Sequence, residues 1–197
     1  MNVDLEPKLA PPGAGLPKVE LFIARRLFAW RRRTGNRERF NARFQEERAR
    51  IERMVRDCDA ETAARRVLIR RPRGLEDSSR YWSVWMTLEH LRIVHGSITD
   101  IISALSRGIV LRGAASTAAV KPGARVTAEV VPAYEKSCDD LLATIADASE
   151  LNTAVRYAHP WFGPLDAAGW HALAAGHLGI HRVQMERILE GAGGARL

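Results

Sequence analysis

Two histidines near the C-terminus, His177 and His181, have the spacing of a metal-binding pair. Four residues of helix return a side chain to nearly the same face, so both imidazoles point the same way. Histidine is the commonest protein metal ligand and binds through a neutral ring nitrogen. The pair alone is a weak indication, because helices carry such spacings by chance. A third histidine, His90, strengthens the metal hypothesis, since it lies in an apolar helical pattern far upstream.

The surroundings of these histidines leave alternatives open. A buried, uncharged and hydrogen-bonded His90 would need no metal. Gln184 follows His181 on the same side of the helix, where it could support a metal ligand or lie on the surface. Gly176 and Gly179 flank the pair. A glycine inside a helix costs about 1 kcal/mol relative to alanine, so we expect close packing there by a neighbouring helix or a ligand.

Other ionisable residues fit the site less well. Glu89 is adjacent to His90, but neighbouring helical positions point about 100° apart, so we expect a surface carboxylate. His95 is expected to point well away from His90, and His171 to lie off the metal-facing side and to be exposed. The sequence therefore shows no clear acid–base residue beside the three histidines.

Long helical patterns without a convincing strand pattern predict an all-α fold, a four-helix bundle over residues 40–191. The second core helix is expected to start at an N-cap, Ser83, and the last at an N-cap, Asp166. Residues 107–130 are rich in small residues and predict a long crossover between the second and third core helices. Residues 59–79 predict a connector with a short helix.

An additional basic amphipathic helix is expected before the bundle, over residues 18–39. The simplest interpretation is that its apolar stripe packs on its own domain, although such a helix could also lie on a membrane or a partner. The stripe comprises Val19, Phe22, Ile23, Leu27 and Trp30. Residues 1–17 contain four prolines and predict a mobile arm, and residues 192–197 predict a frayed tail.

Positive charge is concentrated between Arg25 and Arg73, a segment that contains 17 arginines and 7 acidic residues. The rest of the chain has 13 basic and 16 acidic residues. A solvated helix face is the favoured interpretation. Contact with nucleic acid or an anionic membrane surface stays open but is less favoured, because no aromatic interleaving, zinc-finger or RNP-type motif accompanies the charge.

Composition and cysteine usage indicate a cytoplasmic globular protein. Apolar residues make up 46% of the chain, yet no run approaches the roughly 18–20 apolar residues that cross a bilayer. The first residues contain acids and prolines and do not resemble a signal peptide. Cys58 and Cys138 lack a CxxC spacing, which fits a reducing compartment, although a bridge between them stays open.

Three blocks of sequence carry a family resemblance over about residues 40–190. They are Trp82-Ser83 with Glu89-His90-Leu91, then His159-Pro160-x-Phe162-Gly163-Pro164-Leu165, and then His177-x3-His181-x2-Gln184. In order and spacing the chain resembles the DinB-like superfamily of four-helix-bundle metal proteins. The resemblance implies that His90, His177 and His181 are the metal ligands. His159 matches a His-Pro loop of the family, and we expect it to fix the entry to the last helix or to line the site.

The resemblance also implies a chemistry. Three neutral imidazoles would leave a divalent ion (zinc, nickel, iron or manganese) with vacant positions for a thiol, water or carbonyl. Similar proteins include transferases and isomerases that use low-molecular-weight thiols such as bacillithiol or mycothiol, which implies a thiol attack on a small electrophilic substrate. Two alternatives remain: a non-catalytic metal-binding interaction or stress-response module, and a metal-dependent hydrolase. A homodimer formed through the front helix is also left open.

Overall fold

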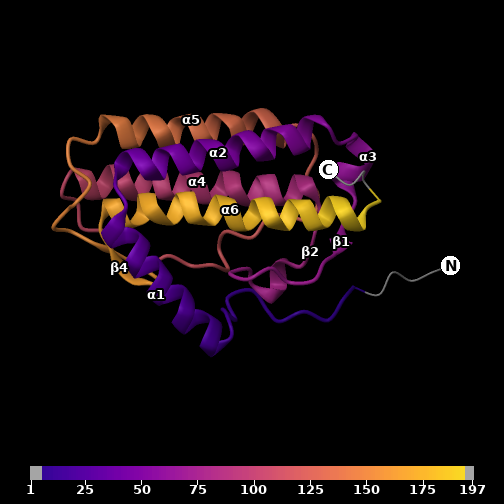
Figure 1. Ribbon diagram of the computed structural model, residues 1–197, viewed down its shortest axis with the longest axis horizontal. Coiled ribbons are helices and arrows are strands. Elements are labelled where there is room, and N and C mark those ends of the chain that lie inside the picture. Colours follow the sequence, from indigo (N-terminus) through magenta and orange to yellow (C-terminus); the bar gives the residue numbers. More distant parts are fainter. Residues whose placement is uncertain (1–5, 194–197) are drawn as a thin grey trace.

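The computed structural model describes residues 6–193, which fold mainly into helices (Figure 1). The helices are α1 Lys18–Thr34, α2 Arg37–Arg56, α3 Ala60–Ala64, α4 Val84–Ser106, α5 Val130–Asp147 and α6 Ala167–Gly191. The long helices α2, α4, α5 and α6 form the bundle, so the predicted four-helix bundle is confirmed. α6 packs against both α2 and α4, and α4 also packs against α5. Among the described residues, no helix has the length and apolar character that crossing a bilayer requires.

The bundle has a continuous apolar core of its own. Apolar residues recur at helical spacing on the inward face of each helix, so every helix has a stripe to bury. Fully buried members include Phe44, Ile51, Leu88, Ile102, Leu141 and Leu178. Burying one such side chain contributes roughly 1.5–3 kcal/mol. We therefore expect the core to support the fold without a bound ligand.

The two predicted N-caps fix where α4 and α6 begin. The Ser83 hydroxyl accepts a hydrogen bond from the Met86 amide at 3.1 Å, and the Asp166 carboxylate accepts one from the Gly169 amide at 2.8 Å. Each bond satisfies an amide that has no partner within its own helix. Fixing these starts also fixes which face of each helix carries its histidines.

Two small antiparallel strand pairs accompany the helices of this all-α fold. β1 (Val67–Leu68) pairs with β2 (Tyr81–Trp82), and β3 (Tyr157–His159) pairs with β4 (Gly163–Leu165). Strands of two or three residues are too short to produce a readable alternation of apolar and polar residues. The crossover between α4 and α5 is irregular, apart from a bridge between Ala114 and Ala158.

Helix α1 lies outside the bundle: one of its ends is next to the bundle beside β4, and the helix slants away from α6 (Figure 1). The prediction that its apolar stripe packs on its own domain is wrong. All five stripe residues are exposed, from Ile23 and Leu27 at 50% to Val19 at 74%. Helical spacing shows that a stripe exists, but it does not show that anything covers the stripe.

Polar anchors hold α1 in place. Glu20 accepts a hydrogen bond from the Gly74 amide at 2.6 Å, and Arg32 pairs with Asp166 at 2.6 Å. Between them, Arg25 donates to the Trp161 carbonyl at 2.6 Å. The helix is thus fixed to the connector at one end and to the start of α6 at the other.

The segment before α1 lies against the connector. The Ala10 amide donates to Asp77 at 2.8 Å, and the Gly15 amide donates to Glu76 at 3.2 Å. The part of the predicted mobile arm at residues 1–5, and the part of the predicted tail at residues 194–197, lie outside the described residues. Their mobility stays a prediction.

Candidate metal centre

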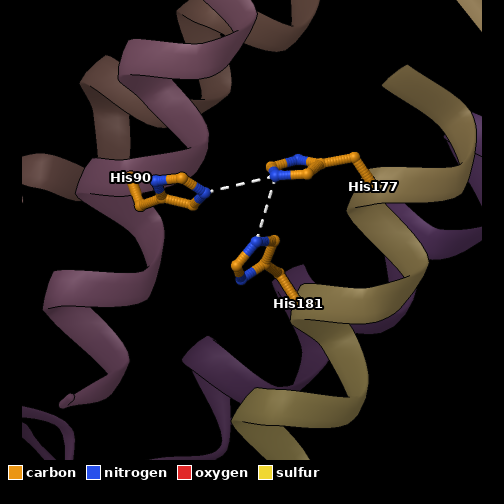
Figure 2. A group of neighbouring side chains, drawn as sticks. All are labelled: His90, His177 and His181. Atoms are coloured by element: carbon orange, nitrogen blue, oxygen red, sulfur yellow. Dashed lines mark hydrogen bonds between the residues drawn. The ribbon is translucent and has the colours of Figure 1, made fainter. Parts of the chain in front are cut away.

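Three imidazoles converge between α4 and α6. His90 projects from α4, and His177 and His181 project from consecutive turns of α6 (Figure 2). The Nε2 atom of His177 lies 3.2 Å from that of His90 and 3.1 Å from that of His181. One nitrogen from each ring falls within 4.8 Å of the others. The structure therefore brings together the three histidines that the sequence singled out.

These spacings fit a shared divalent cation. Nitrogens held about 2.0–2.1 Å from one ion in a tetrahedron lie about 3.3 Å apart. Adjacent nitrogens around an octahedral ion at about 2.1 Å lie about 3.0 Å apart. The observed 3.1 and 3.2 Å separations fall between these values. These two separations suit either geometry and do not select one metal.

Hydrogen bonds set the tautomers of two of the rings. His90 Nδ1 lies 2.7 Å from the Val120 carbonyl oxygen, and His181 Nδ1 lies 2.6 Å from the side-chain oxygen of Gln184. A carbonyl oxygen only accepts, so both Nδ1 atoms carry the proton and both Nε2 atoms present a lone pair. His177 Nδ1 is buried without a hydrogen-bond partner among residues 6–193. No hydrogen bond at Nδ1 therefore sets the tautomer of this ring.

Burial keeps the three imidazoles uncharged. Desolvation lowers the pKa of His90 to about 4, and the hydrogen bond to Val120 only partly opposes this effect. Desolvation, followed by the neighbouring imidazoles, lowers the pKa of His177 and His181 well below the usual value. Neutral imidazole is the form that binds metal. The rings are therefore ready to coordinate near neutral pH without first losing protons.

Trp82 closes one side of the group. Its ring stacks on His181 with an interplanar angle of 9° and lies 5.2 Å from the His90 ring, measured between centroids. Trp82 is 4% exposed. Neither this contact nor the one with the Val120 carbonyl was predicted from the sequence. Trp82 is in β2 and Val120 is in the crossover, and neither position follows from helical spacing.

Gln184 is fully buried, so the surface alternative is wrong. Its side-chain amide donates to the Ser79 carbonyl at 2.7 Å, which orients its oxygen toward His181.

We expect Gln184→Leu to weaken metal binding roughly 10- to 100-fold, the usual effect of removing a side chain that orients a metal ligand. Competitive titration with a chelating dye measures it. Gln184→Glu keeps an acceptor for His181 and should lose less, so equal losses in both variants would contradict this role.

The other singled-out residues lie apart from the three nitrogens. Glu89 makes a bidentate pair with Arg92, as expected for a carboxylate outside the site. His95 is fully buried and points to Ser137. The prediction that His171 is exposed is wrong: it is 1% exposed. Its ring packs edge-on against Phe40 in the α2–α6 interface, on a face that both helices bury.

His159 lies at the end of β3 beside the pocket described below. Its Nδ1 accepts a hydrogen bond from the Trp161 amide at 3.1 Å, and its ring packs on Phe162 and Trp170. Desolvation lowers its pKa to about 4. His159 thus shapes the turn that leads into α6, and it also lines the pocket.

A pocket of about 1140 Å³ opens from the three histidines. Its walls come from α1, α6, the crossover and the loop between β3 and β4, and His90, His177 and His181 all contribute to its lining.

The two glycines that flank His177, Gly176 and Gly179, have different roles. A side chain at Gly179 would meet the Glu47 carboxylate at 3.0 Å, whereas one at Gly176 would meet nothing within 4 Å. Gly179 thus permits α2 to approach, and Gly176 leaves the pocket open next to His177.

This difference gives a test in stability. We expect Gly176→Ala to raise the free energy of unfolding by about 1 kcal/mol, because alanine favours a helix interior and meets no obstacle there. Gly179→Ala is the matched control and should gain less or lose stability, since Glu47 is held in place by Arg182. Urea unfolding of both variants measures the difference. Equal gains would contradict the assignment of Gly179 to helix packing.

The fold and the site define a class of protein, a helical bundle with a three-histidine group open to a large pocket. Residues 43–185 match the model of the DinB superfamily, so the chain belongs to that family. The structure also resembles the crystal structure of TT2238, a four-helix bundle protein. The TM-score is 0.55 at 21% identity, over 74% of this chain and 94% of the other. No curated protein matched the sequence.

Proposed function

We propose that this protein is a divalent-metal-dependent enzyme that activates a low-molecular-weight thiol, or water, for attack on a small electrophile. The observation that carries the proposal is the convergence of three Nε2 atoms at the wall of the pocket. A purely structural zinc site is usually enclosed by four protein ligands. Here only three side chains converge among the described residues, and they face open space.

The residues of the chain support this chemistry in distinct ways. The three imidazoles would hold a divalent cation, which lowers the pKa of a thiol or water in its open positions and so supplies a nucleophile near neutral pH. Val120 and Gln184 keep the coordinating nitrogens of His90 and His181 free of protons. Trp82 stacks on His181 and closes one side of the group, so we expect a nucleophile and an electrophile to reach it from the pocket. In thiol transfer the sulfur bonds to the electrophilic carbon, the leaving group departs with the electron pair, and the thiol proton goes to solvent.

Elemental analysis of protein purified without a histidine tag is the first test. We expect about one divalent metal ion per chain, with zinc, nickel, iron and manganese distinguished directly. Metal-free protein, prepared with a chelator, is then reloaded with each ion. The assay supplies a low-molecular-weight thiol and chlorodinitrobenzene, and it follows release of chloride and formation of the thioether.

The outcomes separate the candidate activities. Metal-dependent thioether formation supports transfer, whereas metal-dependent hydrolysis of an activated ester without thiol supports the hydrolase alternative. Bound metal with neither reaction over a broad panel of electrophiles would favour a non-catalytic module. Protein that binds no divalent ion at micromolar concentration would overturn the proposal.

A further inference from the structure

The pocket carries positive charge that its own acids do not neutralise. Seven basic and four acidic side chains line it. Three of the acids are already engaged in ion pairs: Glu20 with Arg71, Glu47 with Arg182 and Glu76 with Lys121. The excess of base in a partly enclosed space raises the local positive potential and attracts anions.

Within the described chain, four of these basic residues have a guanidinium without a hydrogen bond or an ion pair: Arg31, Arg43, Arg73 and Arg112. Among the four, Arg31 of α1 and Arg43 of α2 are close enough for their charges to interact. Partial burial and then the charge of Arg43 lower the pKa of Arg31. Two like charges that face the same pocket repel each other, and an anion placed between them would remove that repulsion.

The wall beside these arginines is apolar. Leu27 and Phe28 of α1 line one side of the pocket, and Leu173 and Ile180 of α6 line another. Gly176 leaves the space between this wall and His177 open. A ligand with an apolar body and an anionic group matches both features at once.

We propose that Arg31 and Arg43 form a subsite for the carboxylate, sulfonate or phosphate of an organic anion whose apolar body lies between α1 and α6. The inference deepens the proposed function, because it assigns a ligand class to the pocket of the same three histidines. Arg31 precedes the residues that match the family, and Arg43 is the first of them. The subsite therefore depends on a helix that the family match does not include.

Two probes of equal chain length test the subsite, octanesulfonate and the neutral octanol. Calorimetry on the full chain, metal-loaded and chelator-treated, should show tighter binding of the sulfonate. Arg31→Gln and Arg43→Gln should each weaken sulfonate binding about tenfold, the size expected for one charge-assisted hydrogen bond. Octanol binding should stay unchanged in both variants. Added salt should weaken only the sulfonate.

Arg33→Gln is the matched control, since Arg33 is on the same helix but does not line the pocket. Its sulfonate affinity should equal that of the wild type, and circular dichroism should show the same folded state in all three variants. Equal affinity for the two probes, or equal loss in Arg31→Gln and Arg33→Gln, would overturn the subsite. So would loss of sulfonate binding on chelation, which would locate the anion at the metal.

The same measurements separate this inference from the proposed function. His181→Ala should lose metal and keep octanesulfonate binding, whereas Arg31→Gln and Arg43→Gln should keep metal and bind octanesulfonate about tenfold more weakly. If the protein binds the sulfonate but no metal, only the enzymatic proposal is contradicted. If it binds metal but does not prefer the sulfonate to octanol, only the anion subsite is contradicted.

Discussion

Replacing His181 with alanine is expected to abolish metal binding and to leave a folded bundle. His181 supplies one of only three nitrogens that converge in the described chain. Residues that merely support a ligand change affinity by roughly 10- to 100-fold, so removal of a ligand itself should cost more than about 100-fold. His90→Ala and His177→Ala should behave in the same way. Elemental analysis after gel filtration and titration with a chelating dye measure the loss.

The fold should survive because the core does not depend on the site. The fully buried side chains of α2, α4, α5 and α6 form one continuous cluster. His171→Ala is the matched control, since His171 is on the same helix and is also buried, but it lies outside the three-histidine group. It should lose stability to a similar degree and keep its metal. Retention of metal by His181→Ala, or loss of metal by His171→Ala, would contradict the assignment.

Metal-free protein is expected to unfold in mild acid. Desolvation, followed by the neighbouring His90 ring and Arg48, lowers the pKa of His95 to about 3, and desolvation followed by Arg37 lowers that of His171 to about 4. Their unfolded values are about 6.5. Below pH 6.5 the unfolded chain therefore takes up protons that the folded chain does not, and stability falls as the pH falls. The loss accumulates until the folded rings also protonate, near pH 4 and pH 3.

The size of this effect is large for a domain. Each unprotonated buried histidine contributes a slope of about 1.4 kcal/mol per pH unit within that window. From pH 6.5 to about 4, two such residues remove about 6 kcal/mol, comparable with the 5–15 kcal/mol that stabilises a typical domain. Urea unfolding of chelator-treated protein at half-unit steps from pH 8 to pH 5 measures the slope. His95→Gln and His171→Gln should each reduce it by about 1.4 kcal/mol per pH unit, and a flat profile between pH 7 and pH 5 would contradict both assignments.

The sequence predicted what depends on spacing within one helix. His177 and His181 share a face because they are four residues apart, and the apolar surroundings of His90 indicated that it points inward. The helices and the caps at Ser83 and Asp166 follow from similarly local rules. Spacing within a helix does not show that His90 of α4 lies beside His177 and His181 of α6. The family resemblance implied that the three histidines meet.

The predictions that failed concern contacts between distant segments. Gln184 and His171 are buried because Ser79 and Phe40 lie against them, and neither neighbour is near in sequence. The stripe of α1 is exposed because polar anchors hold the helix over a pocket, while its own periodicity equally suits a buried helix. The contact of the Val120 carbonyl could not be predicted from residue types, because every residue has a backbone carbonyl. Such contacts are set by tertiary structure and cannot be read from local pattern.

The buried carboxylate of Glu76 links the entrance of the pocket to its chemistry. It accepts hydrogen bonds from Gly15, just before α1, and from Thr117 in the crossover, and it pairs with Lys121 at 2.7 Å. Lys121 directly follows Val120, whose carbonyl sets the proton position on His90. Glu76 therefore ties the segment before α1 to the part of the crossover that positions His90.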